Sequence, residues 1–165
     1  MALTVIESIA REIVRRLERI KSVNGYAFNV TKVVRPDRNA TWTPEDRLIL
    51  VKQGDSTKNA ELSYPGNPPA VAFDTVFELC GFVRTSDFCD KEYDPIENDR
   101  GAQIIKAITT EATDPGSWYT FAGKAVISDI TEVRSFEESE SHNGVIVSLS
   151  VTHRQDENNP YNVRA

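Results

Sequence analysis

The apolar residues near the N-terminus recur at intervals of three and four positions. Within residues 3–20 they form one helical stripe, and most of the charged residues lie outside it. The stripe consists of Ile6, Ile9, Ala10, Ile13, Leu17 and Ile20. Thr4 followed by Glu7 fits a capping box at the start of this helix, and Asn24-Gly25 provides a stop. The pattern therefore predicts an amphipathic helix with both ends marked.

The next segments alternate between apolar and polar residues with a period of two. Residues 26–34 and 48–51 are rich in β-branched and aromatic types and predict two strands. Residues 70–84 predict a longer strand with one apolar face and one mixed face. Residues 53–69 lie between them and contain Gly, Pro, Asn and Ser, so we expect a loop there.

The second half of the chain predicts one more helix and a hairpin. An acidic loop over residues 87–99 precedes a helical pattern in residues 100–112, which stops at Asp114-Pro115-Gly116. Residues 125–136 and 145–154 then alternate around a polar turn and predict two paired strands. The polar C-terminal residues predict an ordinary frayed or docked terminus.

The predicted element order is α-β-β-β-α-β-β. This order favours an α+β fold with one mainly antiparallel sheet that is flanked on one face by two helices. The chain has 165 residues, which is close to the usual size of one domain, so we expect a single domain over residues 1–165.

Charge is distributed unevenly along the chain. The formal net charge of −6 argues against a protein whose whole surface binds DNA or an anionic membrane. Residues 1–58 carry 11 basic and 7 acidic residues, whereas residues 59–165 carry 8 and 18. Such asymmetry is inert in a compact monomer, or it suits head-to-tail contact between copies that close into a ring.

The sequence predicts a soluble protein in a reducing compartment. Glu7, Arg11 and Glu12 interrupt the N-terminal apolar residues before the core of a signal peptide is complete, and no apolar stretch approaches the roughly 20 residues that cross a bilayer. Cys80 and Cys89 have neither disulfide-framework nor metal-knuckle spacing, so we expect two free thiols.

No motif in the sequence predicts catalysis, a metal or a cofactor. Asp90, Glu92 and Asp94 alternate as calcium ligands do, but the positions that need Gly and Glu in such a loop hold Pro95 and Gly101. The two histidines, His142 and His153, are expected on the surface. No phosphate-binding glycine loop is present in the sequence. We therefore expect no enzyme activity.

The predicted elements carry a series of segments along nearly the whole chain. The N-terminal helix is followed by a strand that ends in Val33-Val34-Arg35-Pro36 and by a second strand that runs into Gln53-Gly54-Asp55. A helix ending near Asp114, the segment WYTFAGKA at residues 118–125 and a closing strand VIVSLSVTHRQDENNPY complete the series. In this order of elements, more than in single residues, the chain resembles the tail terminator and related neck or minor tail proteins of tailed bacteriophages.

The resemblance implies a virion structural protein without catalytic residues or cofactors. Such a subunit assembles in the host cytoplasm into a ring, commonly a hexamer, at the head-proximal end of the tail. Its partners are further copies of itself, the tail tube protein and the head-tail connector or neck proteins. DNA only passes through its channel, and no membrane is involved.

Polarity, length and position between strands suggest which segments make the contacts. The candidates are the loop over residues 36–46, the loop over residues 54–69, the turn over residues 137–144, and the acidic loop, which is expected to face the DNA channel or to be an ordinary solvated loop. The candidate contact residues are Arg35, Arg38, Trp42, Asp90, Glu92, Asp94, Glu137 and Glu138. For Trp42, packing over the sheet edge is an equal alternative to an interface.

Two other classes of protein remain open. The nearer is another head-tail joining, neck or minor tail component, which shares the small α+β architecture and ring assembly. The farther is a ligand-binding or enzymatic α+β domain with a cleft above the sheet, for which the sequence offers no group of reactive residues.

Overall fold

The first helix, α1, spans Val5–Glu18, as its apolar stripe predicts. The Thr4 hydroxyl caps it by accepting a hydrogen bond from the Glu7 backbone N–H at 3.3 Å. A short 3-10 turn, η1 (Ser22–Asn24), follows the helix, and Gly25 takes a φ of 82° directly after it. Gly25 thus supplies the left-handed residue that the Asn24-Gly25 pair predicts. These coordinates are a computed structural model, which describes residues 1–36, 47–84, 93–110, 120–137 and 142–164.

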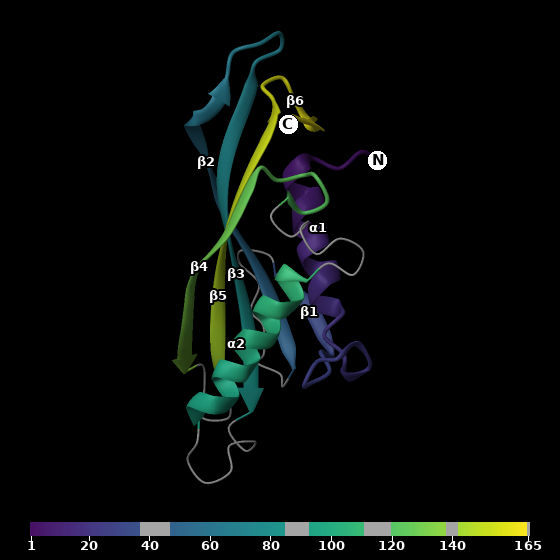
Figure 1. The fold of residues 1–165 in the computed structure, drawn as a ribbon, viewed down its shortest axis with the longest axis vertical. Coiled ribbons are helices and arrows are strands. Elements are labelled where there is room, and N and C mark those ends of the chain that lie inside the picture. The colour runs from purple at the N-terminus through teal and green to yellow at the C-terminus, as the bar shows by residue number, and fades with distance from the viewer. Residues whose placement is uncertain (37–46, 85–92, 111–119, 138–141, 165) are drawn as a thin grey trace.

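One six-stranded sheet forms the body of the molecule (Figure 1). Its strands are β1 (Lys32–Val34), β2 (Leu48–Tyr64), β3 (Ala70–Arg84), β4 (Ile127–Glu137), β5 (His142–Asp156) and β6 (Asn159–Val163). The spatial order is β1-β2-β3-β5-β4, and β6 pairs with β5. Among the strands that the structure describes, β1–β2 is the only parallel pair. The α+β class and the mainly antiparallel sheet are therefore confirmed.

Both helices pack on the same face of the sheet, where they bury the main core. Ile9 and Ile13 of α1 and Ile104 and Ile108 of α2 (Tyr93–Thr109) join sheet residues such as Phe77 in one cluster. Burial of each such side chain contributes about 1.5–3 kcal/mol. A smaller cluster on the opposite face contains Leu48, Leu50, Cys80, Phe82 and Ile146. Residues 79–83 of β3 thus form one continuous buried run, because both faces of the strand are covered at this level.

Strand β2 is much longer than predicted, and the predicted loop over residues 53–69 is wrong for most of its length. The strand continues to Tyr64, with register shifts between Gln53 and Ser56 and between Asn59 and Tyr64. In the second irregularity the Ser63 hydroxyl accepts a hydrogen bond from the Ala72 N–H at 3.0 Å. At this irregularity a polar side chain takes the place of a backbone hydrogen-bond partner. Polar residues are therefore compatible with this part of the strand, although their composition is typical of a loop.

The predicted strand over residues 26–34 shrinks to the three residues of β1 because its first half packs on α2 instead. The Arg100 guanidinium lies 3.7 Å from the centroid of the Phe28 ring, and the Lys106 ammonium lies 4.7 Å from that of Tyr26. Between them, the Gln103 side chain accepts a hydrogen bond from the Ala27 N–H at 3.1 Å. Successive turns of α2 thus hold a segment that bends at Ala27 and Phe28.

Helix α2 begins at Tyr93 rather than at residue 100, so the second part of the predicted acidic loop is helical. A proline is tolerated in the first turn of a helix, so Pro95 is compatible with this earlier start. The helix ends at Thr109, before the predicted stop. Residues 85–92 and 111–119 lie outside the described residues.

The predicted hairpin is confirmed as β4 and β5, and the C-terminal residues add a strand that was not predicted. Strand β5 begins at His142, three residues earlier than expected. Strand β6 folds back on the end of β5, where the Arg164 guanidinium lies 3.3 Å from the Asp156 carboxylate. The polar terminus is therefore docked rather than frayed.

Candidate assembly surfaces

The strand registers place the chain connections at two opposite ends of the sheet. Arg84 at the end of β3 is paired with His142 at the start of β5, and Glu137 at the end of β4 is paired with Asn143. The last residues of β3 and β4 and the first residues of β5 therefore lie at one end of the sheet, which we call the acidic end after Glu137, the last residue of β4. The β2–β3 turn lies at the other end, beside β6 (Figure 1). We call this second end the ribbon tip.

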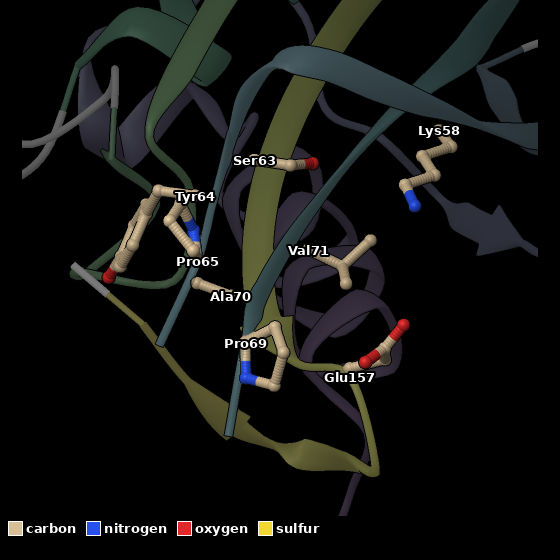
Figure 2. Close-up of a pocket in the computed structure, with 8 residues that line it drawn as sticks. All are labelled: Lys58, Ser63, Tyr64, Pro65, Pro69, Ala70, Val71 and Glu157. Atoms are coloured by element: carbon tan, nitrogen blue, oxygen red, sulfur yellow. The ribbon is translucent and has the colours of Figure 1, made fainter. Parts of the chain in front are cut away.

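The ribbon tip carries an open groove of about 330 Å³ (Figure 2). Its lining residues are Lys58, Ser63, Tyr64, Pro65, Pro69, Ala70, Val71 and Glu157. The Ser63 hydroxyl donates to the Asn59 carbonyl at 2.6 Å, and the Glu157 N–H donates to the Pro69 carbonyl at 2.9 Å. These polar groups thus stabilise the turn itself. The lining of the groove is thus a mixture of charged, polar, aromatic and aliphatic residues.

Arg154 fixes the base of the ribbon tip. Its Nε donates a hydrogen bond to the Leu62 carbonyl at 2.8 Å, and its guanidinium lies 5.3 Å from the centroid of the Tyr64 ring. Tyr64 and Tyr161 retain 36% and 55% exposure. Exposed tyrosines beside arginine are typical of protein interfaces. Tyr64 lies in the loop over residues 54–69 that was predicted to make contacts, but neither tyrosine was predicted as a contact residue, because the prediction used polarity.

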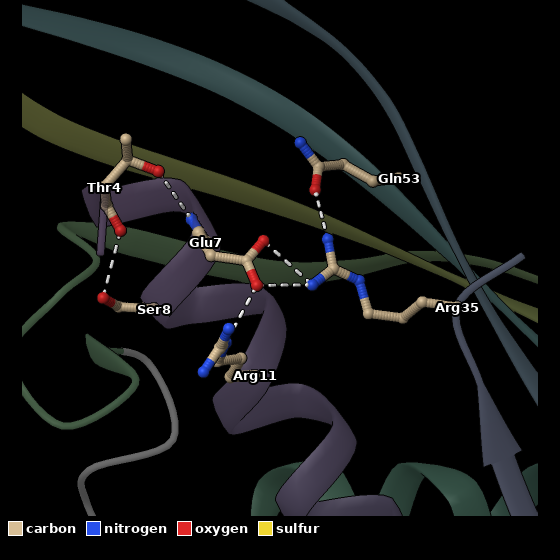
Figure 3. Close-up of polar contacts among 6 residues, drawn as sticks. All are labelled: Thr4, Glu7, Ser8, Arg11, Arg35 and Gln53. Atoms are coloured by element: carbon tan, nitrogen blue, oxygen red, sulfur yellow. Dashed lines mark hydrogen bonds and ion pairs between the residues drawn. The ribbon is translucent and has the colours of Figure 1, made fainter. Parts of the chain in front are cut away.

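Among the predicted contact residues, Arg35 lies just after β1 in an ion-pair cluster (Figure 3). Its Nη1 donates to both Glu7 carboxylate oxygens at 2.9 Å, and its Nη2 donates to the Gln53 side-chain oxygen at 3.2 Å. Arg11 donates to the same Glu7 carboxylate at 2.9 Å. Burial acts to raise the pKa of Glu7, but the hydrogen bonds from Arg11 and Arg35 outweigh it and lower that pKa. The cluster joins α1 to the β1–β2 side of the sheet.

Arg35 therefore has a role inside the subunit, although 31% of its side chain is exposed. An Arg35→Glu substitution would place a carboxylate beside Glu7 and disturb the subunit as well as any contact between subunits. Arg38 and Trp42, the other predicted members of this surface, lie outside the described residues.

Two of the predicted acidic contact residues, Asp94 and Glu137, lie within the described part of the chain. Asp94 falls in the first turn of α2, and Glu137 is the last residue of β4. Both positions belong to the acidic end. Asp90, Glu92 and Glu138 lie outside the described residues. No group of three or more His, Cys, Asp or Glu side chains that could hold a metal ion occurs among the residues that the structure describes.

Arg16, like His153, is a buried charged or titratable residue that the sequence did not predict to be buried. The side chain of Arg16 is fully buried: its Nε donates to Glu12 at 2.9 Å, its Nη1 donates to the Ile108 carbonyl at 2.6 Å, and it stacks on Phe121 at 4.7 Å. Burial acts to raise the pKa of Glu12, but the hydrogen bonds from Arg15 and Arg16 lower it overall. Arg16 thus joins α1 to the end of α2.

The expectation of a surface position is wrong for His153. This residue is 2% exposed and stacks on Phe73 with ring centroids 5.9 Å apart. Burial lowers the pKa of His153, and a hydrogen bond with Gln155 and the charge of Asp74 oppose this only in part. Its position near the end of the chain suggested exposure, but β6 and α1 extend the core to this level.

Comparison with protein-family models finds no match, and comparison with curated proteins finds none either. Over the described ranges, no helix is both long enough and apolar enough to span a membrane.

Proposed function

We propose that this protein is a virion structural protein of a tailed bacteriophage, a terminator that forms a ring at the head-proximal end of the tail tube. The observation that carries the proposal is the resemblance in element order described above. The helix, three strands, helix and strand pair occur in this order along the chain, with both helices on one face of the sheet. In this role the subunit is not an enzyme and binds no cofactor.

The shape of the subunit supports a role in assembly. The sheet is long, its two ends differ in composition, and the helices cover one face (Figure 1). A ring between the tail tube and the connector needs different surfaces at its two ends, as well as lateral surfaces that bind its own copies. The ribbon tip, with its exposed tyrosines, and the acidic end are two such different surfaces.

A second candidate from the same class is a neck or head-tail joining component. The same features favour it, because it also needs a rigid subunit, two different ends and self-complementary sides. Tail length separates the two candidates, since only loss of a terminator leaves growth of the tail tube unchecked.

Negative-stain microscopy of particles from a phage that lacks this gene tests the proposal. Overlong tails of variable length are the result expected for a terminator. Tails of normal length detached from filled heads would assign the protein to the neck instead. Normal infectious particles would contradict any structural role. Complementation with the wild-type gene controls for effects on neighbouring genes.

A further inference from the structure

One row of side chains crosses the sheet on the face opposite the helices. The register pairs Lys52 of β2 with Glu78 of β3, Glu78 with Ser148 of β5, and Ser148 with Glu132 of β4. Directly paired residues of neighbouring strands lie on the same face. A basic residue therefore lies on this row at β2 and an acidic residue at β4, at the same level of the sheet.

The basic side is the edge made by β1 and by the part of β2 that extends beyond it. β1 pairs with β2 only from Lys32↔Leu48 to Val34↔Leu50, so the described part of β1 ends just before the level of Lys52. Lys32 is paired with Leu48 of β2 and lies on the same face as Leu48. Leu48 and Lys52 are four residues apart on one strand and therefore also share a face, so Lys32 and Lys52 lie on the same face of the sheet. Lys32 is exposed. We call Lys32 and Lys52 the basic edge.

The acidic side is the outer edge of β4, which has β5 as its only neighbour among the described strands. Asp129 pairs with Ser150 and Glu132 with Ser148, so the two acids share the face of Lys52. The side chain of Glu132 is 56% exposed. Arg134 reaches inward to Glu78 at 3.5 Å and also contacts Glu132 at 3.5 Å. We call Asp129 and Glu132 the acidic edge. Next to it Ile127 remains 48% exposed, which adds apolar area to this side.

From this geometry we infer that the acidic edge of one copy binds the basic edge of a second copy of this chain. Lys52 and Glu132 lie at the same level on opposite sides of one sheet and on the same face, so repeating the subunit sideways in one orientation brings this basic residue toward this acidic one. Lys32 and Asp129 lie at other levels and add to the charge of their edges. Two different complementary surfaces of this kind make a head-to-tail contact, which closes into a ring when the rotation between copies allows it. The inference rests on the proposed function in taking the assembly to be a ring, and it names the surfaces that form it.

Charge reversal on each edge tests the inference by sedimentation velocity of the purified full-length protein. Reversing the acidic edge with Asp129→Lys and Glu132→Lys, or the basic edge with Lys32→Glu and Lys52→Glu, is expected to weaken association about 100-fold, or tenfold per charge. The quadruple variant carries both reversals in every copy and is expected to regain association. Glu18→Lys with Glu61→Lys makes the same change in net charge as reversal of the acidic edge, at two exposed positions outside both edges and outside the groove, and is expected to leave association unchanged. Equal weakening in this control, or no recovery in the quadruple variant, would overturn the inference.

Cross-linking keeps the inference testable if the ring forms only on tails. A Lys52→Cys, Glu132→Cys variant, supplied to the deletion phage and treated with a short bismaleimide, is expected to give a ladder of linked oligomers. Each single-cysteine variant records the background from Cys80 and Cys89. Tails of normal length without a ladder would overturn the interface but leave the terminator function standing. A ladder of linked oligomers, combined with normal tail length in the deletion phage, would support the interface but overturn the terminator function.

Discussion

At the scale of single residues, the least predictable features are charged or titratable groups inside the core. Arg16 lies beside the apolar stripe of α1, and the helical pattern predicted it outside the buried face. Its carbonyl partner at Ile108 is 92 residues away in the sequence, so no local pattern signals the contact. His153 is similar, because its burial depends on elements that are distant in the sequence. Thr4, in contrast, caps its helix as predicted, because capping is a local interaction.

Removing the buried guanidinium is expected to cost stability. Arg16→Ala loses the Glu12 pair, the Ile108 hydrogen bond and the Phe121 contact, and should lower the free energy of unfolding by about 2–4 kcal/mol. The neighbouring Arg15→Ala removes a pair whose arginine is 48% exposed and should cost less than about 1 kcal/mol. Urea unfolding measures both values. Equal costs for the two variants would contradict the structural role of Arg16.

Burial of His153 predicts a loss of stability in mild acid. The unfolded chain binds a proton at this histidine near pH 6.5, whereas the folded chain, with its lowered pKa, resists protonation. Protons therefore favour unfolding, and the free energy of unfolding should fall as the pH drops below about 6.5, by at most about 1.4 kcal/mol per pH unit from this group.

Thermal melts between pH 7.5 and 5.5 measure this effect. His153→Gln is expected to flatten the pH dependence, although the variant is less stable throughout. His142→Gln, which changes the other histidine, is expected to retain the wild-type slope. An unchanged slope in His153→Gln would show that another group causes the pH dependence.

At the scale of elements, hydrophobic periodicity predicted every long element except the outer half of β2. The outer part of β2 lies at the edge of the sheet, where β3 is its only neighbour among the described strands, and its residues from Gly54 to Lys58 are exposed. Without a buried face a strand needs no apolar alternation, so its composition is that of a loop. β1 shows the opposite error: Tyr26 and Phe28 have strand-like residue types, yet they pack against cationic side chains of α2.

The β4–β5 hairpin provides a test of packing on the face without helices. A Cβ atom at Gly144 would lie 2.4 Å from the ring of Phe136, which packs edge-on against Phe82 with centroids 5.8 Å apart. Gly144→Ala must displace this ring and is expected to lower the free energy of unfolding by about 1–3 kcal/mol.

A double-mutant cycle isolates the cause of this cost. In a Phe136→Leu background the shorter side chain leaves room for the new methyl group, so Gly144→Ala should cost less there. Chemical denaturation of the four proteins gives the coupling. If the free-energy costs of Gly144→Ala and Phe136→Leu are additive in the double variant, the Phe136 ring does not oppose the Gly144→Ala substitution.

At the scale of the whole molecule, the class of fold could be predicted but the neighbours in the sheet could not. Local alternation shows that a strand exists, whereas the parallel β1–β2 pair and the insertion of β5 between β3 and β4 depend on long-range contacts. The candidate contact residues were chosen by polarity, which does not distinguish a free surface charge from one held within the subunit. Arg35 proved to be held by Glu7, and the basic and acidic edges became visible only through strand register.

The length distribution of tails in the deletion phage, with the protein supplied in trans at increasing levels, tests the proposed function most directly. A terminator stops tube growth at a set point, so the distribution should narrow from long and variable to the single wild-type length as the protein is added. Tail lengths that are uniform without the protein and unaffected by its addition would contradict the account.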